Sequence, residues 1–152
     1  METIGGAEAR SIIIESFGFL GEGNSFLSKI LVCDREYLLL NKQFVNSRFM
    51  NHTSMHPTLY QRDVFDCDDY CLMAKAVSSA DAVVQGFDYP YALGFIVTDI
   101  HATSFFINDD FDIQLVDFWK AKFTGRDDDI TLFLRDDLGE WLYPGSLRLI
   151  YM

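Results

Sequence analysis

The chain has few basic residues: 12 Lys and Arg stand against 23 Asp and Glu, which leaves a formal net charge of −11. A surface of this sign repels phosphate groups, so we expect no nucleic-acid partner and no binding to anionic membranes. Cations or cationic partners suit it better. The same charge is also typical of an acidic protein whose copies repel one another and so stay dispersed.

Long apolar runs are missing as well. No segment approaches the roughly 20 apolar residues that a membrane-spanning helix needs. The N-terminal segment, METIGGAEARSIIIESFGFL, has acidic residues before its three consecutive isoleucines and lacks the basic start of a secretory signal. We therefore predict a cytoplasmic protein.

Cysteine is scarce and poorly spaced for a metal. Cys33, Cys67 and Cys71 form no C-x-x-C pair, which argues against a zinc site. Cys67 and Cys71 are four residues apart, a spacing that rarely gives disulfide geometry on a helix. These features predict free thiols in a reducing compartment.

No internal repeat, low-complexity tract or linker divides the sequence. With 152 residues, 49% of them hydrophobic, it has the size of one ordinary domain and can bury a core without disulfides or metal. We predict a single domain over residues 1–152.

Helical patterns dominate the first half of the chain. Residues 7–20 predict a short helix, and residues 41–51 carry apolar side chains at helical spacing. Residues 29–40 fit either a strand or a helix, and 52–63 predict a loop. The clearest helix is expected over 67–84, where Asp66 is a capping residue.

The second half has the composition of strands. Branched and aromatic residues predict four of them, at 93–108, 113–123, 130–136 and 145–152. Helices followed by consecutive strands predict an α+β domain with an antiparallel sheet in its C-terminal half.

The stretch VFDCDDYCLMAKA, residues 64–76, places Cys67 at the predicted helix start. There the helix dipole and unpaired N–H groups favour a thiolate. The carboxylates of Asp66, Asp68 and Asp69 oppose it. Cys67 is thus either a small core residue or a nucleophile whose acidic neighbours are neutralised.

His101 and Asp117 supply the other two groups of a possible triad. A hairpin turn centred on Asp109 would place Asp117 directly across from His101, close enough to orient its imidazole. A slip of one residue would put Phe118 there instead. Cysteine as nucleophile, histidine as base and an acid beside the base is the general arrangement of an activated thiol.

These segments together resemble the papain-like, transglutaminase-like cysteine peptidases. FDCDDYCLMAKA, GFIVTDIHATSFFIND and DIQLVDF are similar to motifs of the bacterial transglutaminase-like group and of the protease domain in mushroom agglutinins, over roughly residues 37–120. The resemblance implies Cys67 as nucleophile, His101 as base and Asp117 as orienting acid. It also implies a papain-like fold, with the nucleophile's helix packed on the sheet.

The resemblance is incomplete in one segment. The returning strand reads VDFWKA and lacks the Pro-Gln of the family, so Asp99 is an alternative to Asp117.

The resemblance also implies an oxyanion donor. Papain-like enzymes have a Gln before the nucleophile whose amide, with the backbone N–H of the nucleophile, binds the oxyanion. Gln61 is the candidate here, Gln43 is a second, and an ordinary loop glutamine is the alternative.

The resemblance to the agglutinin proteases also implies calcium. Asp68 and Asp69 would supply oxygen ligands, and a bound divalent ion would turn an unfavourable site into one that permits a thiolate. The alternative is that these carboxylates only complement the helix dipole. No organic cofactor is expected.

We therefore predict a cysteine hydrolase, a peptidase or amidase, that acts on a peptide or protein through an acyl-enzyme. Two alternatives are a catalytically inactive binding or inhibitor protein of the same fold, and an acyl transferase of the transglutaminase type. A third interpretation, an acidic mimic that occupies a basic partner, rests on charge alone.

Overall fold

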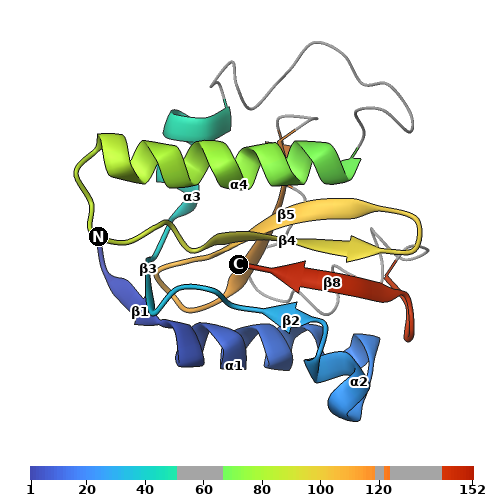
Figure 1. Ribbon diagram of the computed structural model, residues 1–152. Helices are drawn as coiled ribbons and strands as arrows, with labels where there is room; N and C mark the ends of the chain where they lie inside the picture. Colours follow the sequence, from blue (N-terminus) through green and yellow to red (C-terminus); the bar gives the residue numbers. More distant parts are fainter. Residues whose placement is uncertain (51–66, 119–121, 124–141) are drawn as a thin grey trace.

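A central sheet carries helices on both faces (Figure 1). The computed structural model describes residues 1–50, 67–118, 122–123 and 142–152. In order across the sheet, the strands are β2 (Ile30–Leu31), β8 (Leu147–Tyr151), β4 (Leu93–Thr98), β5 (Ala102–Ile107), β6 (Ile113–Asp117) and β7 (Lys122–Phe123).

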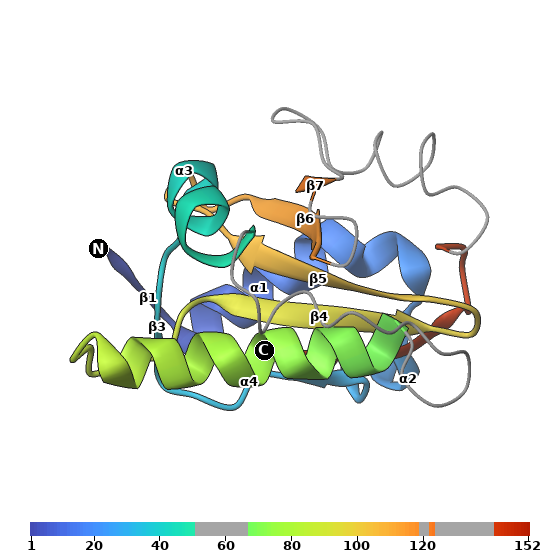
Figure 2. The same ribbon diagram turned by 90° about the horizontal axis from the view of Figure 1, so that it is seen from above.

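Helices from the first half of the chain lie on opposite sides of this sheet (Figures 1 and 2). On one side are α1 (Gly6–Phe17), the 3₁₀ turn η1 (Gly18–Leu20) and α2 (Gly23–Leu27). On the other are α3 (Lys42–Val45), its π-helical continuation η2 (Asn46–Met50) and the long helix α4 (Cys67–Val84). A separate antiparallel pair, β1 (Thr3–Gly5) with β3 (Glu36–Leu38), lies near the start of α1.

Alternation along the strands divides the core into two layers. In β5, Phe105 and Ile107 pack with the apolar residues of α1, whereas Phe106 packs with those of α4. This is the period of two that buries both faces of a strand covered on each side. Buried residues of the two long helices in these layers include Ala9, Ile13 and Phe17 from α1 and Ala74 and Ala82 from α4.

Most of the predicted elements are present. The helices expected at 7–20, 41–51 and 67–84 and the strand expected at 145–152 correspond to α1 with η1, α3 with η2, α4 and β8. The ambiguous segment 29–40 contains two short strands, β2 and β3. The predicted loop 52–63 and strand 130–136 lie outside the described residues, and the single-domain assignment stays a prediction.

Three expectations about the strands are wrong. The sheet is mixed, because β2 from the first half pairs with β8 in parallel. The segment 113–123 forms two strands, since β6 pairs antiparallel with β7. The segment 93–108 forms a hairpin of β4 and β5. Such pairings depend on long-range contacts, which local sequence patterns do not contain.

β4 and β8 approach one another so closely that one position requires glycine. A Cβ atom at Gly94 would lie 2.3 Å from the carbonyl oxygen of Tyr151. The approach matters for the candidate site because β4 leads directly into the turn that carries His101.

Candidate functional site

Cys67 is the first residue of α4, as the sequence predicted. Its side chain is partly buried and packs against a small cluster formed by Cys71, Phe95 and Ala102. Backbone N–H groups in the first turn of a helix lack intrahelical partners and stabilise negative charge. A thiolate at Cys67 therefore gains support from the helix, against the opposing carboxylates of Asp68 and Asp69.

His101 lies in the turn between β4 and β5, directly before Ala102. The prediction that it sits in the middle of one strand is wrong. Thr98 closes the turn, because its backbone N–H donates to the carbonyl oxygen of His101 at 2.8 Å. In a single strand over 93–108, Phe95 and Phe105 would lie on the same face. The turn breaks this alternation, because Phe95 belongs to the cluster under Cys67 whereas Phe105 packs toward α1.

The fold brings the starts of α4 and β5 together. Helix α4 packs against β4 and β5, and the cluster that contacts Cys67 includes Ala102, the neighbour of His101. The two residues thus belong to adjoining segments although they are far apart in the sequence. His101 is partly exposed and so is within reach of a substrate.

Asp117 does not lie directly across from His101 in the sheet. The observed pairs between β5 and β6, such as Ser104 with Val116 and Ile107 with Ile113, centre the hairpin on Asp110 rather than on Asp109. This register shifts Asp117 by two residues from its predicted position. Its backbone ends β6 and pairs with Lys122 of β7.

The turn itself explains the shift. The backbone N–H of Asn108 donates to the carbonyl oxygen of Asp112 at 2.9 Å. The side-chain oxygen of Asn108 accepts from the N–H groups of Asp110 (3.0 Å) and Asp112 (2.7 Å). Phe111 takes a positive φ of 64°, a conformation that a side chain of its kind rarely adopts. The turn therefore spans residues 108–112.

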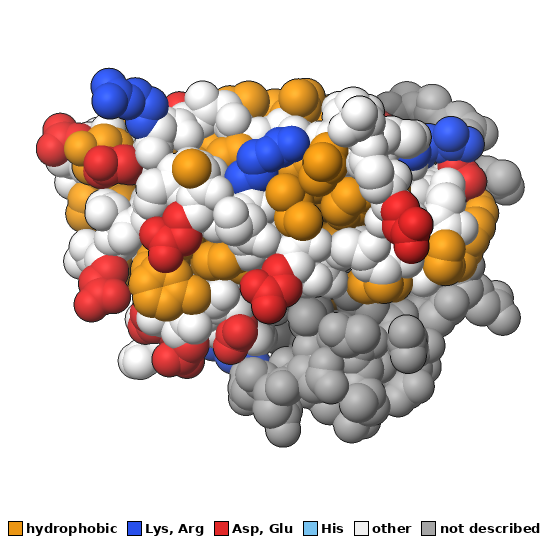
Figure 3. Space-filling view, turned by 90° about the horizontal axis from the view of Figure 1, so that it is seen from below, with side chains coloured by type: hydrophobic (Ala, Val, Ile, Leu, Met, Phe, Trp, Pro, Cys, Tyr) orange, Lys and Arg blue, Asp and Glu red, His pale blue; other side chains and the backbone are white. Residues whose placement is uncertain are grey.

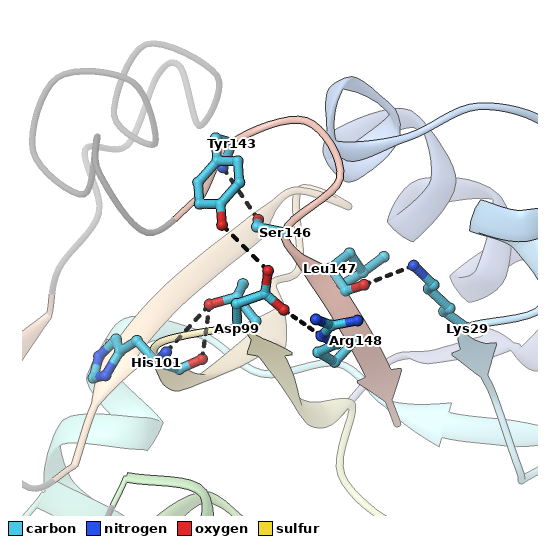
Figure 4. A network of polar contacts seen from close by, with 8 residues as sticks. Lys29, Asp99, His101, Tyr143, Ser146, Leu147 and Arg148 are labelled. Atoms are coloured by element: carbon cyan, nitrogen blue, oxygen red, sulfur yellow. Dashed lines mark hydrogen bonds and ion pairs between the residues drawn. The ribbon is translucent and has the colours of Figure 1, made fainter.

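Asp99, the alternative acid, is bound elsewhere. Its carboxylate forms an ion pair with Arg148 and accepts a hydrogen bond from the Tyr143 hydroxyl at 3.2 Å. In Figure 4 the imidazole of His101 points away from these contacts. The hydrogen bond to Asp99 raises the pKa of Tyr143.

The glutamine candidates remain predictions. Gln61 and the capping residue Asp66 lie outside the described residues. Gln43 lies on α3 with an exposed side chain.

The proposed calcium ligands supply only part of a coordination shell. Calcium takes six to eight oxygen ligands, whereas Asp68 and Asp69 offer two carboxylates, that of Asp68 exposed. Among the described residues no group of three or more His, Cys, Asp or Glu is placed to hold a metal. Calcium thus stays a prediction, and we derive no step of a mechanism through it.

Two features near Cys67 were not predicted. Phe95 and Tyr151, a cross-strand pair of β4 and β8, stack at 5.5 Å between ring centroids and are members of the apolar cluster or packed against it. Farther along α4, burial lowers the pKa of Lys75, whose Nζ lies 5.6 Å from the centroid of the Tyr37 ring. A lysine on an otherwise apolar stripe is the only local signal for the second feature.

No disulfide joins any of the three cysteines, all of which lie in the described part of the chain. The described helices include none with both the length and the apolar character to cross a bilayer. On the face seen in Figure 3, acidic side chains are scattered among apolar and uncharged ones rather than gathered in one place.

Comparison with known proteins identifies the fold. No protein-family model and no curated protein matches the sequence. The structure named as the PSL1a–E64 complex matches 99% of this chain with a TM-score of 0.73 and 15% identity. A lectin of Polyporus squamosus, bound to the human-type influenza-binding epitope Neu5Aca2-6Galb1-4GlcNAc, matches 99% with a TM-score of 0.67 and 14% identity.

The chain spans about half the length of these two proteins, 51% and 49%. At this level of identity the likeness concerns the fold alone. The prediction of an α+β, papain-like domain with the Cys67 helix packed on a sheet is confirmed, with the sheet mixed rather than wholly antiparallel.

Proposed function

We propose that the protein is a cysteine hydrolase in which Cys67 is the nucleophile and His101 the general base. The observation that carries the proposal is the packing of Cys67, at the start of α4, against the cluster that includes Ala102, the neighbour of His101. A thiol at a helix N-terminus beside a histidine-bearing turn is the arrangement that thiolate chemistry requires.

The chemistry would proceed through an acyl-enzyme. The Cys67 sulfur attacks the carbonyl carbon of a peptide or side-chain amide, and its proton passes to His101. His101 returns that proton to the leaving amine as the C–N bond breaks. Water then attacks the thioester with His101 again as base, which releases the acid and restores the thiol.

Asp117 is proposed as the group that orients His101. β5 and β6 are antiparallel, so Asp117, the last residue of β6, lies at the end of the sheet where β5 begins beside His101. The contact would be diagonal rather than directly across. Gln61, with the backbone N–H of Cys67, is proposed as the oxyanion donor.

Two alternatives use the same fold. Transfer of the acyl group to an amine instead of water would make the protein a transglutaminase-like enzyme. A binding or inhibitor protein without catalysis is favoured by the absence of the Pro-Gln pair on the returning strand. Thiol reactivity separates this last alternative from the two enzymes.

The chain contains its own reference thiol for such a test. Cys33 is exposed, Cys67 partly buried and Cys71 buried. Trypsin cleaves after Lys29, Arg35, Arg62 and Lys75, so Cys33 leaves in a different peptide from Cys67 and Cys71, which fragmentation then distinguishes.

The experiment is alkylation at pH 6 by iodoacetamide and by E-64, the compound named in the PSL1a complex, with site-resolved mass spectrometry. An unperturbed thiol with a pKa near 8.5 is only about 0.3% ionised at this pH. An activated Cys67 should react roughly 10- to 100-fold faster than Cys33 despite its lower exposure. His101→Ala should remove most of that difference.

A Cys67 that reacts no faster than Cys33 would overturn the proposal and favour the inactive binding protein. If Cys67 is activated, incubation with a peptide amide in the presence and absence of a primary amine separates hydrolysis from acyl transfer. Cys67→Ala, which should abolish either product, is the control.

A further inference from the structure

The turn that carries His101 is fixed by an unusual number of hydrogen bonds. The Thr98 hydroxyl donates to the carbonyl oxygen of His101 at 3.0 Å and accepts from the His101 N–H at 3.3 Å. The Thr98 N–H donates to the same carbonyl oxygen at 2.8 Å. The buried Thr98 thus holds both backbone polar groups of His101 (Figure 4).

Asp99 ties this turn to the segment that leads into β8. Its N–H donates to the carbonyl oxygen of Ser146 at 3.0 Å. Its carboxylate binds Arg148 on one side and the hydroxyl of Tyr143 on the other. The side chain of Asp99 is 26% exposed and that of Arg148 is 64% exposed, so the ion pair alone adds little stability.

The segment that leads into β8, residues 143–147, is in turn hydrogen-bonded to residues of the N-terminal part of the chain. Gly145, with a φ of 89°, donates its N–H to the carbonyl oxygen of Leu20 at 2.8 Å. Lys29 donates to the carbonyl oxygen of Leu147 at 2.8 Å. Ser146 is fully buried, and its hydroxyl accepts from the N–H of Tyr143 at 3.2 Å. A continuous set of contacts therefore joins the His101 turn to η1 and to Lys29, the residue directly before β2.

Within the turn, these contacts engage the backbone of His101 and the residues Thr98 and Asp99, while the imidazole of His101 points away from Asp99 (Figure 4). A general base must lie within hydrogen-bond reach of its partner. A displacement of about 1 Å can lower a rate by two orders of magnitude. The hydrogen bonds of Thr98 therefore fix the backbone from which the imidazole extends, on the side of the turn opposite to Asp99.

We propose that Thr98, Asp99, Arg148 and Tyr143 are positioning residues that hold His101 in place to activate Cys67. This inference rests on the proposed function and extends it to groups outside the triad. The competing interpretation is that the same contacts only stabilise the end of a hairpin.

The test measures the pH dependence of Cys67 alkylation by iodoacetamide, from pH 5 to pH 9, and needs no substrate. Thr98→Val preserves shape but removes the hydroxyl from His101, and Tyr143→Phe removes one hydrogen bond from Asp99 without changing charge. Asp110→Asn, an exposed carboxylate in the turn at the opposite end of β5, is the matched control.

In the wild type, an imidazolium at His101 should keep the alkylation rate high down to the acid end of the range. Thr98→Val should lower the rate at pH 6 roughly tenfold, and Tyr143→Phe by less. Both should approach the wild-type rate at pH 9, where the thiol ionises without help. Arg148→Lys, which keeps the charge, should retain more of the pH 6 rate than Arg148→Gln, and Asp110→Asn should match the wild type.

The outcomes distinguish the two proposals. A wild-type profile with no activation at pH 6 overturns the proposed function, and the positioning role with it. An activated wild type whose profile is unchanged in Thr98→Val and Tyr143→Phe overturns only the positioning role. A lower melting temperature with an unchanged profile also overturns the positioning role, because the contacts then stabilise the hairpin and nothing more.

Discussion

Lys75 is a position at which a substitution should make the protein more stable. It lies on α4 with its Nζ fully enclosed, and no hydrogen-bond acceptor reaches that atom among the residues that the structure describes. The ring of Tyr37, 5.6 Å away, and the negative charge of Asp34 partly compensate for the buried charge. We consider Lys75→Met, which keeps the length and helix propensity of the side chain.

The expected change in the free energy of unfolding is the balance of three contributions. A buried polar group without a hydrogen-bond partner costs about 1–3 kcal/mol, and a charged one more. The cation–π contact with Tyr37 returns about 0.5–2 kcal/mol. In the Lys75→Met variant, contact of the Met sulfur with the same ring would contribute about 0.3–1.5 kcal/mol in place of the cation–π contact. Lys75→Met should therefore raise the free energy of unfolding by about 1–2 kcal/mol, or the melting temperature by about 3–6 °C.

The pH dependence of the stability difference between Lys75→Met and the wild type tests this explanation more sharply. Burial lowers the pKa of Lys75 below its ordinary value of 10.5, so the folded protein holds this proton less tightly than the unfolded chain does. Below the lowered pKa the fold bears the full cost of the charge. Between that pKa and 10.5 the wild type gains stability with rising pH, and the Met variant does not. The advantage of Lys75→Met should shrink across that window.

Urea unfolding at pH 7 and at pH 10, followed by circular dichroism, measures both effects. Lys29→Met is the matched control, because Lys29 donates to the carbonyl oxygen of Leu147 at 2.8 Å and its loss should cost about 1 kcal/mol. A Lys75→Met protein that is less stable than the wild type at pH 7, or whose advantage grows toward pH 10, would refute the reasoning.

Three further predictions concern contacts that support the fold and the proposed calcium ligands. Asp81→Asn should lower the melting temperature by roughly 5 °C in a thermal scan, because Asp81 binds Arg48 and the hydroxyl of Tyr91 and so ties α4 to η2; an unchanged scan would contradict this. Gly94→Ala should cost about 3 kcal/mol in urea unfolding because of the 2.3 Å approach to Tyr151, whereas Gly5→Ala, with nothing near its Cβ position, should cost far less. Calorimetric titration with calcium should give heat that Asp68→Asn reduces, and the absence of heat with the wild type would end the calcium proposal.

Local patterns in the sequence were sufficient to predict the helix that begins at Cys67. Acidic residues in the first turn and apolar residues at helical spacing placed α4 correctly from its first residue, Cys67, to its last, Val84. Capping and periodicity are properties of neighbouring residues, so they can be recognised in the sequence without knowledge of the fold. The same reasoning identified α1 and the helical character of α3.

The turn at His101 could not be found in this way. Thr98–His101 contains no Gly, Pro or Asn, and Asp99 is its one common turn residue, so it resembles the branched strands on either side. What closes it is the hydroxyl of Thr98 and a set of contacts to Tyr143, Ser146 and Arg148, which are distant in the sequence. Side chains that act only in the folded state leave no periodic signal.

The position of Asp117 shows how one turn decides the geometry of a distant site. The five-residue turn closed by Asn108 sets the register of β5 against β6, and a turn centred one residue earlier would shift every pair by two positions. His101 would then face Asp117 directly. In the observed register the two residues are offset by two positions along the strands. The turn at Asn108 thus sets the spacing that any contact between Asp117 and His101 would bridge, and the hydrogen bonds of Thr98 hold the backbone of His101 at the other end of that spacing.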